Sequence, residues 1–299
     1  MTQPYRSGVV AILGPPNAGK STLLNRLLQQ KIAIVSPKPQ TTRNRIMGVV
    51  HGDNYQMILL DTPGLHEAKE EINRRMVRAA LDSIAEADVI LFLTDSSEAT
   101  PERPERLQQQ LAFLEAAQAP VVLALNKVDL APKTQLLPLI DWYRTQYPFA
   151  AIVPLTALHG DGVEPLVQEL AARLPAGPKY YPDDMPTDVS ERFIAAEIVR
   201  ESVFLRTRDE VPYATAVLID LFDESMEPLR IVASILVERN SQKGILIGKG
   251  GAMLAQIRKR ATAEISRVLG RSVRLELWVK VQKNWTEDEK FLRSLGLPE

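Results

Sequence analysis

The residues with the clearest chemistry lie in one short run, Gly14–Ser21, which matches the pattern G-x-x-x-x-G-K-[ST]. A loop of this kind surrounds phosphate oxygens with backbone N–H groups, while its lysine reaches the outer phosphates and its hydroxyl residue binds Mg²⁺. An apolar run precedes the loop at Val9–Leu13 and a helical pattern follows it at Thr22–Leu28, as the motif requires. The residues expected to bind the phosphates of a nucleotide are Gly14, Asn17, Ala18, Gly19, Lys20, Ser21 and Thr22.

A second group of residues could complete a magnesium site. The predicted strand Tyr55–Leu60 runs into Asp61-Thr62-Pro63-Gly64, and an acidic residue at such a strand end faces the phosphate loop and the metal. Gly64 can donate its N–H to the terminal phosphate and can act as a hinge. The polar loop Ser36–Arg45 supplies Thr41 and Thr42, and the hydroxyl of either could bind Mg²⁺.

A third group predicts which base is bound. The apolar run Val121–Leu125 leads into Asn126-Lys127-Val128-Asp129, whose carboxylate can accept hydrogen bonds from both N1 and N2 of guanine. Adenine has an acceptor at N1, which Asp129 would repel, so the pattern favours guanine. Asn126 and Lys127 should tie the loop together and cover the base. In Thr156-Ala157-Leu158, the Ala157 N–H is placed to meet guanine O6.

Strands and helices alternate between these motifs. We expect a hairpin of Ile46–Val50 with Tyr55–Leu60, later strands at Val89–Thr94, Val121–Leu125 and Ala151–Leu155, and helices at Glu70–Ala87, Arg103–Gln118, Leu136–Gln146 and Glu164–Leu174. The alternation predicts an α/β domain with a mostly parallel sheet and helices on both faces. Each motif follows the carboxyl end of a strand, where open sheets of this class bind ligands.

The five motifs in this order resemble those of the translation-factor-related GTPases. The phosphate-loop Asn17 and the apolar Leu65 after Gly64 are similar to the Era-like branch, which lacks the catalytic glutamine. Leu65 cannot orient water by hydrogen bonding, so we expect slow intrinsic hydrolysis. The resemblance implies that Thr42, immediately before an arginine, is the switch threonine. It also implies that Asn17 helps hold a potassium ion in place of an arginine finger; a side chain that only rigidifies the loop is the alternative.

On this interpretation, hydrolysis depends on Lys20, Thr42 and Gly64, and the Mg²⁺ ligands are Ser21, Thr42 and Asp61. Guanine is bound by Asn126, Lys127, Asp129, Thr156, Ala157 and Leu158. Thr156 departs from the commoner serine of this family, a mild change because the base contact is through the backbone.

A proline-rich stretch, residues 176–187, predicts a stiff linker between domains at 1–175 and 188–299. Beyond it we expect a helix at Asp188–Glu201, strands at Ala214–Leu221 and Leu229–Glu238, helices at Ala252–Ala261 and about Ala263–Leu269, and a strand at Val273–Val281. This α-β-β-α-α-β order, with Gly248-Lys249-Gly250-Gly251 between two helices, resembles an α+β KH RNA-binding domain. The RNA-binding residues so implied are Lys243, Gly244, Ile245, Ile247, Gly248, Lys249, Gly250, Gly251 and Arg258.

Charge is unevenly distributed in this second half. Residues 239–283 carry eleven basic and two acidic residues, a net charge of +9, whereas residues 188–238 have a net charge of −6. The basic part surrounds the glycine turn, as a surface that follows phosphates requires. The capping pattern Thr286-x-x-Glu289 predicts a last helix that begins at Thr286 and packs Phe291, Leu292 and Leu295 on the domain.

Composition limits the remaining possibilities. The 299-residue chain has no cysteines, which excludes disulfides and thiolate metal sites, and its net charge of −1 points to no partner by itself. The N-terminus lacks a signal-peptide pattern and no apolar run is long enough to span a membrane. We therefore expect a cytoplasmic monomer, and peripheral contact with the inner face of the membrane stays open.

A GTPase of this branch joined to a KH domain resembles one family along essentially the whole chain. The resemblance implies a GTP-dependent switch in small ribosomal subunit maturation that binds small-subunit ribosomal RNA near its 3′ end, with GTP or GDP and Mg²⁺ as cofactors. The alternative is an RNA-binding scaffold whose guanine nucleotide only stabilises the fold. A nucleotide kinase would have no use for the motif at 126–129.

Overall fold

The computed structural model describes residues 4–65, 71–97, 100–102, 104–115 and 117–296. Backbone contacts divide them into two compact units. The first contains residues 4–30, 42–65 and 73–188, and the second contains residues 31–41, 71–72 and 189–296. The predicted division at 175 and 188 stays a prediction. No helix within the described ranges is long and apolar enough to cross a membrane.

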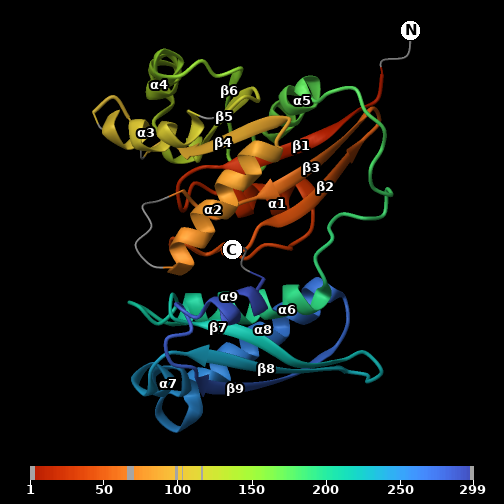
Figure 1. The fold of residues 1–299 in the computed structure, drawn as a ribbon, viewed down its shortest axis with the longest axis vertical. Coiled ribbons are helices and arrows are strands. Elements are labelled where there is room, and N and C mark those ends of the chain that lie inside the picture. Colours follow the sequence, from red (N-terminus) through yellow and green to blue (C-terminus); the bar gives the residue numbers. More distant parts are fainter. Residues whose placement is uncertain (1–3, 66–70, 98–99, 103, 116, 297–299) are drawn as a thin grey trace. The chain divides into compact units, whose positions relative to one another are not determined.

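The first unit is built on one sheet, which has six strands in the described part of the chain, in the order β2-β3-β1-β4-β5-β6 (Figure 1). The strands are β1 (Arg6–Leu13), β2 (Ile46–Gly52), β3 (Tyr55–Asp61), β4 (Val89–Asp95), β5 (Val121–Asn126) and β6 (Ala151–Pro154). β2 pairs with β3 in antiparallel fashion and the other pairs are parallel. The predicted mostly parallel sheet is confirmed.

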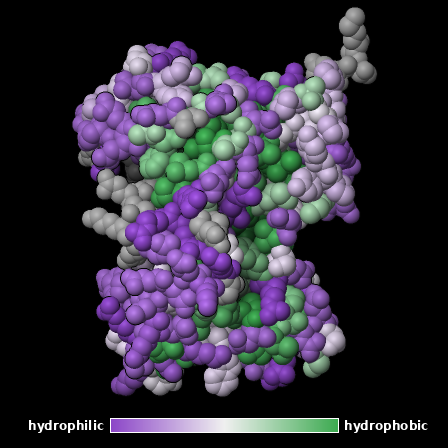
Figure 2. All heavy atoms as spheres, viewed as in Figure 1, coloured by the Kyte–Doolittle hydropathy of each residue, from purple (hydrophilic) through white to green (hydrophobic). Residues whose placement is uncertain are grey.

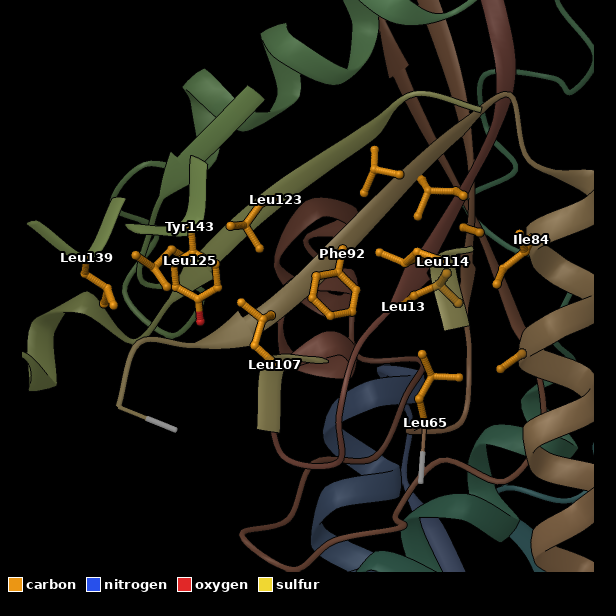
Figure 3. Close-up of a cluster of buried hydrophobic side chains, with 14 residues drawn as sticks. Leu13, Leu65, Ile84, Phe92, Leu107, Leu114, Leu123, Leu125, Leu139 and Tyr143 are labelled. Carbon is orange, nitrogen blue, oxygen red and sulfur yellow. The ribbon is translucent and has the colours of Figure 1, made fainter. Parts of the chain in front are cut away.

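Helices cover both faces of this sheet, which excludes water from strands that are mostly apolar. They are α1 (Lys20–Leu28), α2 (Glu71–Glu86), α3 (Pro104–Leu111), α4 (Lys133–Gln146) and α5 (Val163–Arg173). Figure 3 shows the core on one face, where Phe92 and Leu125 of the sheet lie with Ile84 of α2 and Tyr143 of α4. Alternate strand residues such as Ile12 are equally buried on the other face, where α1 and α5 contact the strands. Hydrophilic side chains cover most of the surface visible in Figure 2.

The expected helix Arg103–Gln118 is shorter than predicted. In the structure α3 ends at Leu111 and a 3₁₀ turn follows at Ala112–Leu114, while residues 103 and 116 lie outside the described residues. The predicted first residue of α2, Glu70, also lies outside them.

The proline-rich stretch after α5 lies along the first unit. Gln56 of β3 is fully buried, and its Oε1 accepts hydrogen bonds from the backbone N–H groups of Tyr180 (2.8 Å) and Tyr181 (3.0 Å). Further along, the Val49 N–H of β2 donates to the carbonyl oxygen of Pro186 at 2.8 Å. The Thr187 hydroxyl donates to the Met47 carbonyl of the same strand. These bonds fix the stretch to the sheet over most of its length.

The second unit has the predicted KH order, α-β-β-α-α-β. Its elements are α6 (Glu191–Arg206), β7 (Ala216–Asp223), β8 (Leu229–Val237), α7 (Asn240–Ile247), α8 (Ala252–Leu269), β9 (Val273–Val281) and a terminal α9 (Glu289–Ser294). Within the described residues its sheet has the order β7-β8-β9, antiparallel between the first pair and parallel between the second.

Two helix predictions in this unit are wrong. The break expected between Ala261 and Ala263 is absent, because Ile257, Ala261 and Ile265 form one buried stripe and neither Gly nor Pro interrupts α8. The last helix begins at Glu289 instead of Thr286, with Asp288 as its cap.

The Thr286 hydroxyl donates instead to Glu238 at 2.6 Å. The packing prediction for this tail holds for Leu292, which is fully buried. Trp285 is also fully buried and donates its indole N–H to the Ala214 carbonyl.

The segment Lys31–Thr41 belongs to the second unit, where it packs on α6. Glu201 of α6 is buried, and its carboxylate accepts from Lys31 Nζ (2.7 Å) and from the Val35 N–H (2.9 Å). Lys31 also pairs with Glu264 of α8 at 2.8 Å. Beside them, the Arg200 guanidinium donates to the Thr41 carbonyl.

Candidate functional site

The phosphate loop lies where the sequence predicts it, between β1 and α1. Gly14 has φ 142°, and a Cβ there would lie 2.0 Å from the Leu93 carbonyl oxygen, so only glycine fits. Gly19 caps α1 with φ 101°. The buried Lys20 folds back on the loop, and its Nζ donates to the carbonyls of Gly14 (3.0 Å) and Pro15 (2.9 Å). The N-terminus of α1 and this ammonium therefore form one positively polarised cradle.

Three predicted magnesium ligands converge beside the cradle. Ser21 Oγ donates to Asp61 Oδ2 at 2.7 Å and lies 2.8 Å from Thr42 Oγ1. Asp61 Oδ1 is buried and has no hydrogen-bond partner among the described residues. An orphaned carboxylate oxygen beside two hydroxyls fits a hard cation that prefers oxygen ligands. Of the two candidate threonines, the structure brings Thr42 to this cluster.

The cluster has one carboxylate, which suits Mg²⁺ shared with a nucleotide. In the described ranges no three His, Cys, Asp or Glu side chains gather as a metal site. Mg²⁺ commonly takes one or two carboxylates and completes its shell with water and phosphate oxygens. Burial raises the pKa of Asp61 to about 6, against the opposing effects of Lys20 and Ser21. Burial also lowers the pKa of Lys20 to about 8, against the attraction of Asp61.

The segment after β3 lies directly against the phosphate loop. The Thr62 hydroxyl donates to the Ile12 carbonyl at 2.8 Å. A Cβ at Gly64 would lie 2.8 Å from the Pro16 nitrogen, so this close approach requires glycine. Leu65 is 3% exposed, and Figure 3 shows its side chain in the hydrophobic core with Leu13 and Phe92. The residue in the usual position of a water-positioning glutamine is therefore part of the core.

The base-binding motifs meet at the ends of β5 and β6. Asn126 Nδ2 donates to the Ala18 carbonyl of the phosphate loop at 2.7 Å, and its Oδ1 accepts from the Ala157 N–H at 2.9 Å. Asp129 Oδ1 accepts from the Thr156 hydroxyl at 3.0 Å, so threonine orients this carboxylate by its side chain. The Ala157 N–H predicted to meet guanine O6 is thus already bonded to Asn126, and it could reach the base only as a shared, three-centre donor.

Sequence reasoning missed two residues that organise this region. Asp95 ends β4, and its carboxylate pairs with Lys127 Nζ at 2.7 Å and accepts from Ser97 N–H at 2.9 Å. Burial alone would raise the pKa of Asp95, but the hydrogen bonds from Lys127 and Ser97 outweigh it and lower the pKa. Arg26 of α1 donates to the carbonyls of Ala157 and Leu158. The pairing of β4 with β5 could have pointed to Asp95, whereas nothing in the sequence indicates the role of Arg26.

The remaining predicted nucleotide residues lie around the cradle. Ala18 is buried and Thr22 half-buried in the first turn of α1. Asn17 is exposed at the tip of the loop with φ 64°, a conformation that asparagine tolerates better than most residues. Leu158 is 64% exposed beside the base loop.

The glycine turn of the second unit joins α7 to α8. Gly248, Gly250 and Gly251 all have positive φ, and a Cβ at either of the last two would meet nothing within 4 Å. Backbone there is open to a ligand. Lys249 and Arg258 are exposed, Ile245 is 47% exposed, and Lys243 and Ile247 are half-buried; Gly244 is also open. The two helices that flank the turn bring all the predicted RNA-binding residues into one region.

Comparisons with known proteins identify a family for each half of the chain. Residues 9–127 match the family described as 50S ribosome-binding GTPase, and residues 210–286 match the KH domain family. The chain is 52% identical to the GTPase Era of Geobacter metallireducens and 48% identical to that of Syntrophus aciditrophicus. The first match covers 98% of both chains, and the second covers 99% of this chain and 96% of the relative.

Two solved structures resemble the whole chain. A structure of Era in complex with MgGDPNP and nucleotides 1506–1542 of 16S ribosomal RNA has a TM-score of 0.92 and 43% identity, and covers 99% of this chain and 100% of its own. An Aquifex aeolicus Era variant bound to GDP·AlF4⁻ has a TM-score of 0.90 and 42% identity over 98% of this chain and 100% of its own.

Proposed function

The chain belongs to the family of the GTPase Era, and on that premise we propose that it is a GTP-hydrolysing switch in small ribosomal subunit assembly. Its KH domain binds small-subunit ribosomal RNA near the 3′ end. The main observation behind the proposal is that Ser21, Thr42 and Asp61 lie together beside a buried lysine. The same chain also contains two helices joined by a glycine turn, the arrangement that would bind RNA.

Each residue of the nucleotide site has a separate role in hydrolysis. Lys20 and the N–H groups at the start of α1 bind phosphate oxygens and offset the charge that develops as the terminal phosphate leaves. Ser21, Thr42 and Asp61 would hold Mg²⁺, which when bound neutralises charge on the phosphate oxygens. Gly64 lies against the phosphate loop and donates its N–H to the terminal phosphate. Loss of that phosphate would remove this hydrogen bond and release the segment.

Slow intrinsic hydrolysis follows from the position of Leu65. Its side chain is buried and carries no hydrogen-bonding group that could orient water. We propose that a potassium ion held by Asn17 supplies the missing charge. The exposed loop-tip position of Asn17 supports this role, and its left-handed backbone equally supports the alternative, in which it only shapes the loop.

GTP turnover in potassium and in sodium separates these roles for Asn17. Asn17→Gly keeps the left-handed conformation but removes the amide, and it should abolish any advantage of potassium. Gln29→Gly is the matched control, because Gln29 is exposed and also has positive φ (52°) but lies at the far end of α1. Equal turnover of the unaltered protein in both salts would refute the potassium role.

The RNA partner follows from the whole-chain relatives. The family description of the GTPase part names the 50S subunit, whereas the solved full-length relative holds a 16S ribosomal RNA fragment. The latter covers both domains, so we favour the small subunit. The test is binding to an oligonucleotide with the 16S 3′ end against one with its sequence scrambled.

Gly251→Asp should abolish this binding, because it adds negative charge where phosphates pass. Gly270→Asp is the matched control. Gly270 also has positive φ and open space around it, but it lies at the C-terminal end of α8, away from the glycine turn. Equal binding of both oligonucleotides would count against the proposed specificity.

The alternative is an RNA-binding scaffold in which the nucleotide is structural. GTP turnover measured with and without the 16S oligonucleotide distinguishes the switch from the scaffold. In a switch, RNA binding and GTP turnover are coupled, and in a scaffold they are not. Stimulation by RNA that Gly251→Asp removes supports the switch. RNA affinity that is identical with a GTP analogue, with GDP and without nucleotide would favour the scaffold.

We further propose a cytoplasmic monomer. Light scattering should give a mass near 33.3 kDa, and a stable dimer would contradict this. Flotation with anionic vesicles tests peripheral association with the membrane.

A further inference from the structure

Arg26 connects the helix at the phosphates with the loop at the base. It lies in the last turn of α1, and its Nε donates to the Ala157 carbonyl at 3.3 Å. A second guanidinium nitrogen donates to the Leu158 carbonyl. The guanidinium also lies over Gly160, where a Cβ would stand 3.9 Å from Arg26 Cζ.

The loop that Arg26 contacts, which contains Ala157 and Leu158, is also held by other hydrogen bonds. The Ala157 N–H is bonded to Asn126, and the Gly160 N–H turns back to the Thr156 carbonyl at 2.8 Å. Arg26 holds the carbonyls on the opposite side. The N–H and the carbonyl of Ala157 belong to two neighbouring planar peptide units that meet at its Cα. Bonds to both units restrict rotation at Ala157 and so help to fix the direction of its N–H.

α1 therefore connects two parts of one ligand site. Its first residues, Lys20 and Ser21, belong to the phosphate cradle, and Arg26 lies at its other end. A helix of this length is rigid and spans roughly 13 Å. Arg26 and α1 thus form a second connection between the phosphate cradle and the base loop, beside the direct one through Asn126.

We propose that Arg26 is a positioning residue for recognition of the 6-oxo group of guanine, a role that rests on the proposed nucleotide site. Arg26 does not touch the nucleotide. It holds the Ala157 N–H in the direction from which a shared hydrogen bond can reach the 6-oxo oxygen. Without it the base loop rotates about the bond to Asn126, and the contact at position 6 weakens while those at N1 and N2 stay.

The test compares three diphosphates by calorimetry: GDP, IDP, which keeps the 6-oxo group and lacks the 2-amino group, and 6-thio-GDP, which lacks the 6-oxo oxygen. Arg26→Ala should weaken GDP and IDP about fivefold, the effect of losing charge-assisted hydrogen bonds at a partly exposed site. It should weaken 6-thio-GDP less than twofold. Arg26→Lys, which keeps the charge and one donor, should recover part of the loss.

Arg173→Ala is the matched control. Arg173 also lies in the last turn of a helix, α5, and donates to the carbonyl of Ala150, next to β6 but at its opposite end. It should leave all three affinities unchanged. Equal weakening of all three ligands by Arg26→Ala, or no weakening of GDP, would overturn the positioning role. If the unaltered protein bound no GDP, the proposed function itself would fail.

Discussion

Replacing Asp95 by asparagine tests how the lysine of the guanine motif is held. Asp95 is the last residue of β4 and is paired in register with Asn126, the last residue of β5. Lys127 follows directly, and its ammonium lies 2.7 Å from the Asp95 carboxylate. Asparagine preserves the shape and the acceptor for Ser97, but it turns an amide donor toward the ammonium. Lys127 would lose its ion pair with Asp95 while its backbone stays in the left-handed conformation, φ 60°.

The size of the effect follows from burial. The Asp95 side chain is 8% exposed and that of Lys127 is 32% exposed. Exposed ion pairs contribute at most about 1 kcal/mol, whereas breaking a fully buried one costs roughly 3–5 kcal/mol. A half-buried pair should lie between these values, at about 1.5 kcal/mol, which is close to a tenfold change in affinity.

Stopped-flow release of fluorescent GDP measures this change. We expect dissociation about tenfold faster and association nearly unchanged, since most affinity changes at one site appear in the off-rate. Asp141→Asn is the control, because it breaks an exposed ion pair to Arg144 far along α4 and should change nothing. A release rate within twofold of the unaltered protein, with the urea midpoint retained, would refute the reasoning.

The ion pair also has a defined pH range. The pKa of Asp95 lies below its ordinary value of 3.8, so the stability it contributes is present above that value. It is lost only as pH falls further, through the pKa of the folded state. The effect of Asp95→Asn on release should therefore be constant from pH 6 to 8.

Other consequences can be measured directly. Because the pKa of Asp61 is about 6, protons compete with the metal, and Mg²⁺ affinity of the GDP-bound protein should fall toward tenfold per pH unit below pH 6 in calorimetry; a flat profile would contradict this. Gly14→Ala places a Cβ 2.0 Å from a backbone oxygen and should cost about 3 kcal/mol or more in urea unfolding, so a loss under 1 kcal/mol would be incompatible with this geometry. Arg258→Ala should weaken every RNA similarly and reduce the salt slope of binding by about one, and an unchanged slope would remove Arg258 from the phosphate contacts.

Much of the nucleotide site could be predicted because its chemistry is local in sequence. Gly14, Lys20 and Asp61 stand in short motifs at strand ends, and the parallel sheet brings those ends together. Asp95, Arg26 and Gln56 act through partners 32 to 132 residues away, and no motif marks them. Distant contacts of this kind depend on the packed structure and leave no periodic signal.

The second domain shows the same limit for helices. The sequence predicts the order of elements but divides α8 in two and does not predict where α7 begins. α7 starts at Asn240, after the cap Arg239, because Gln242 accepts from the N–H groups of Glu238 and Arg239. The predicted start of the last helix is also wrong, because Thr286 bonds to Glu238, in the connection between β8 and α7, and Asp288 caps the helix instead. At the tail a tertiary hydrogen bond decides between two local alternatives, whereas α8 is continuous because of its buried stripe and α7 is capped by a local bond.

The proline-rich stretch along β2 has a consequence for aggregation. β2 is the outermost strand of the first sheet on that side, and an uncovered edge strand can pair with another molecule. The carbonyl of Pro186 and the hydroxyl of Thr187 occupy backbone groups of β2, while the prolines of the stretch offer no N–H for a further strand. An isolated GTPase domain cut at residue 175 would open this edge, so one ending at residue 188 should stay dispersed where the shorter one precipitates.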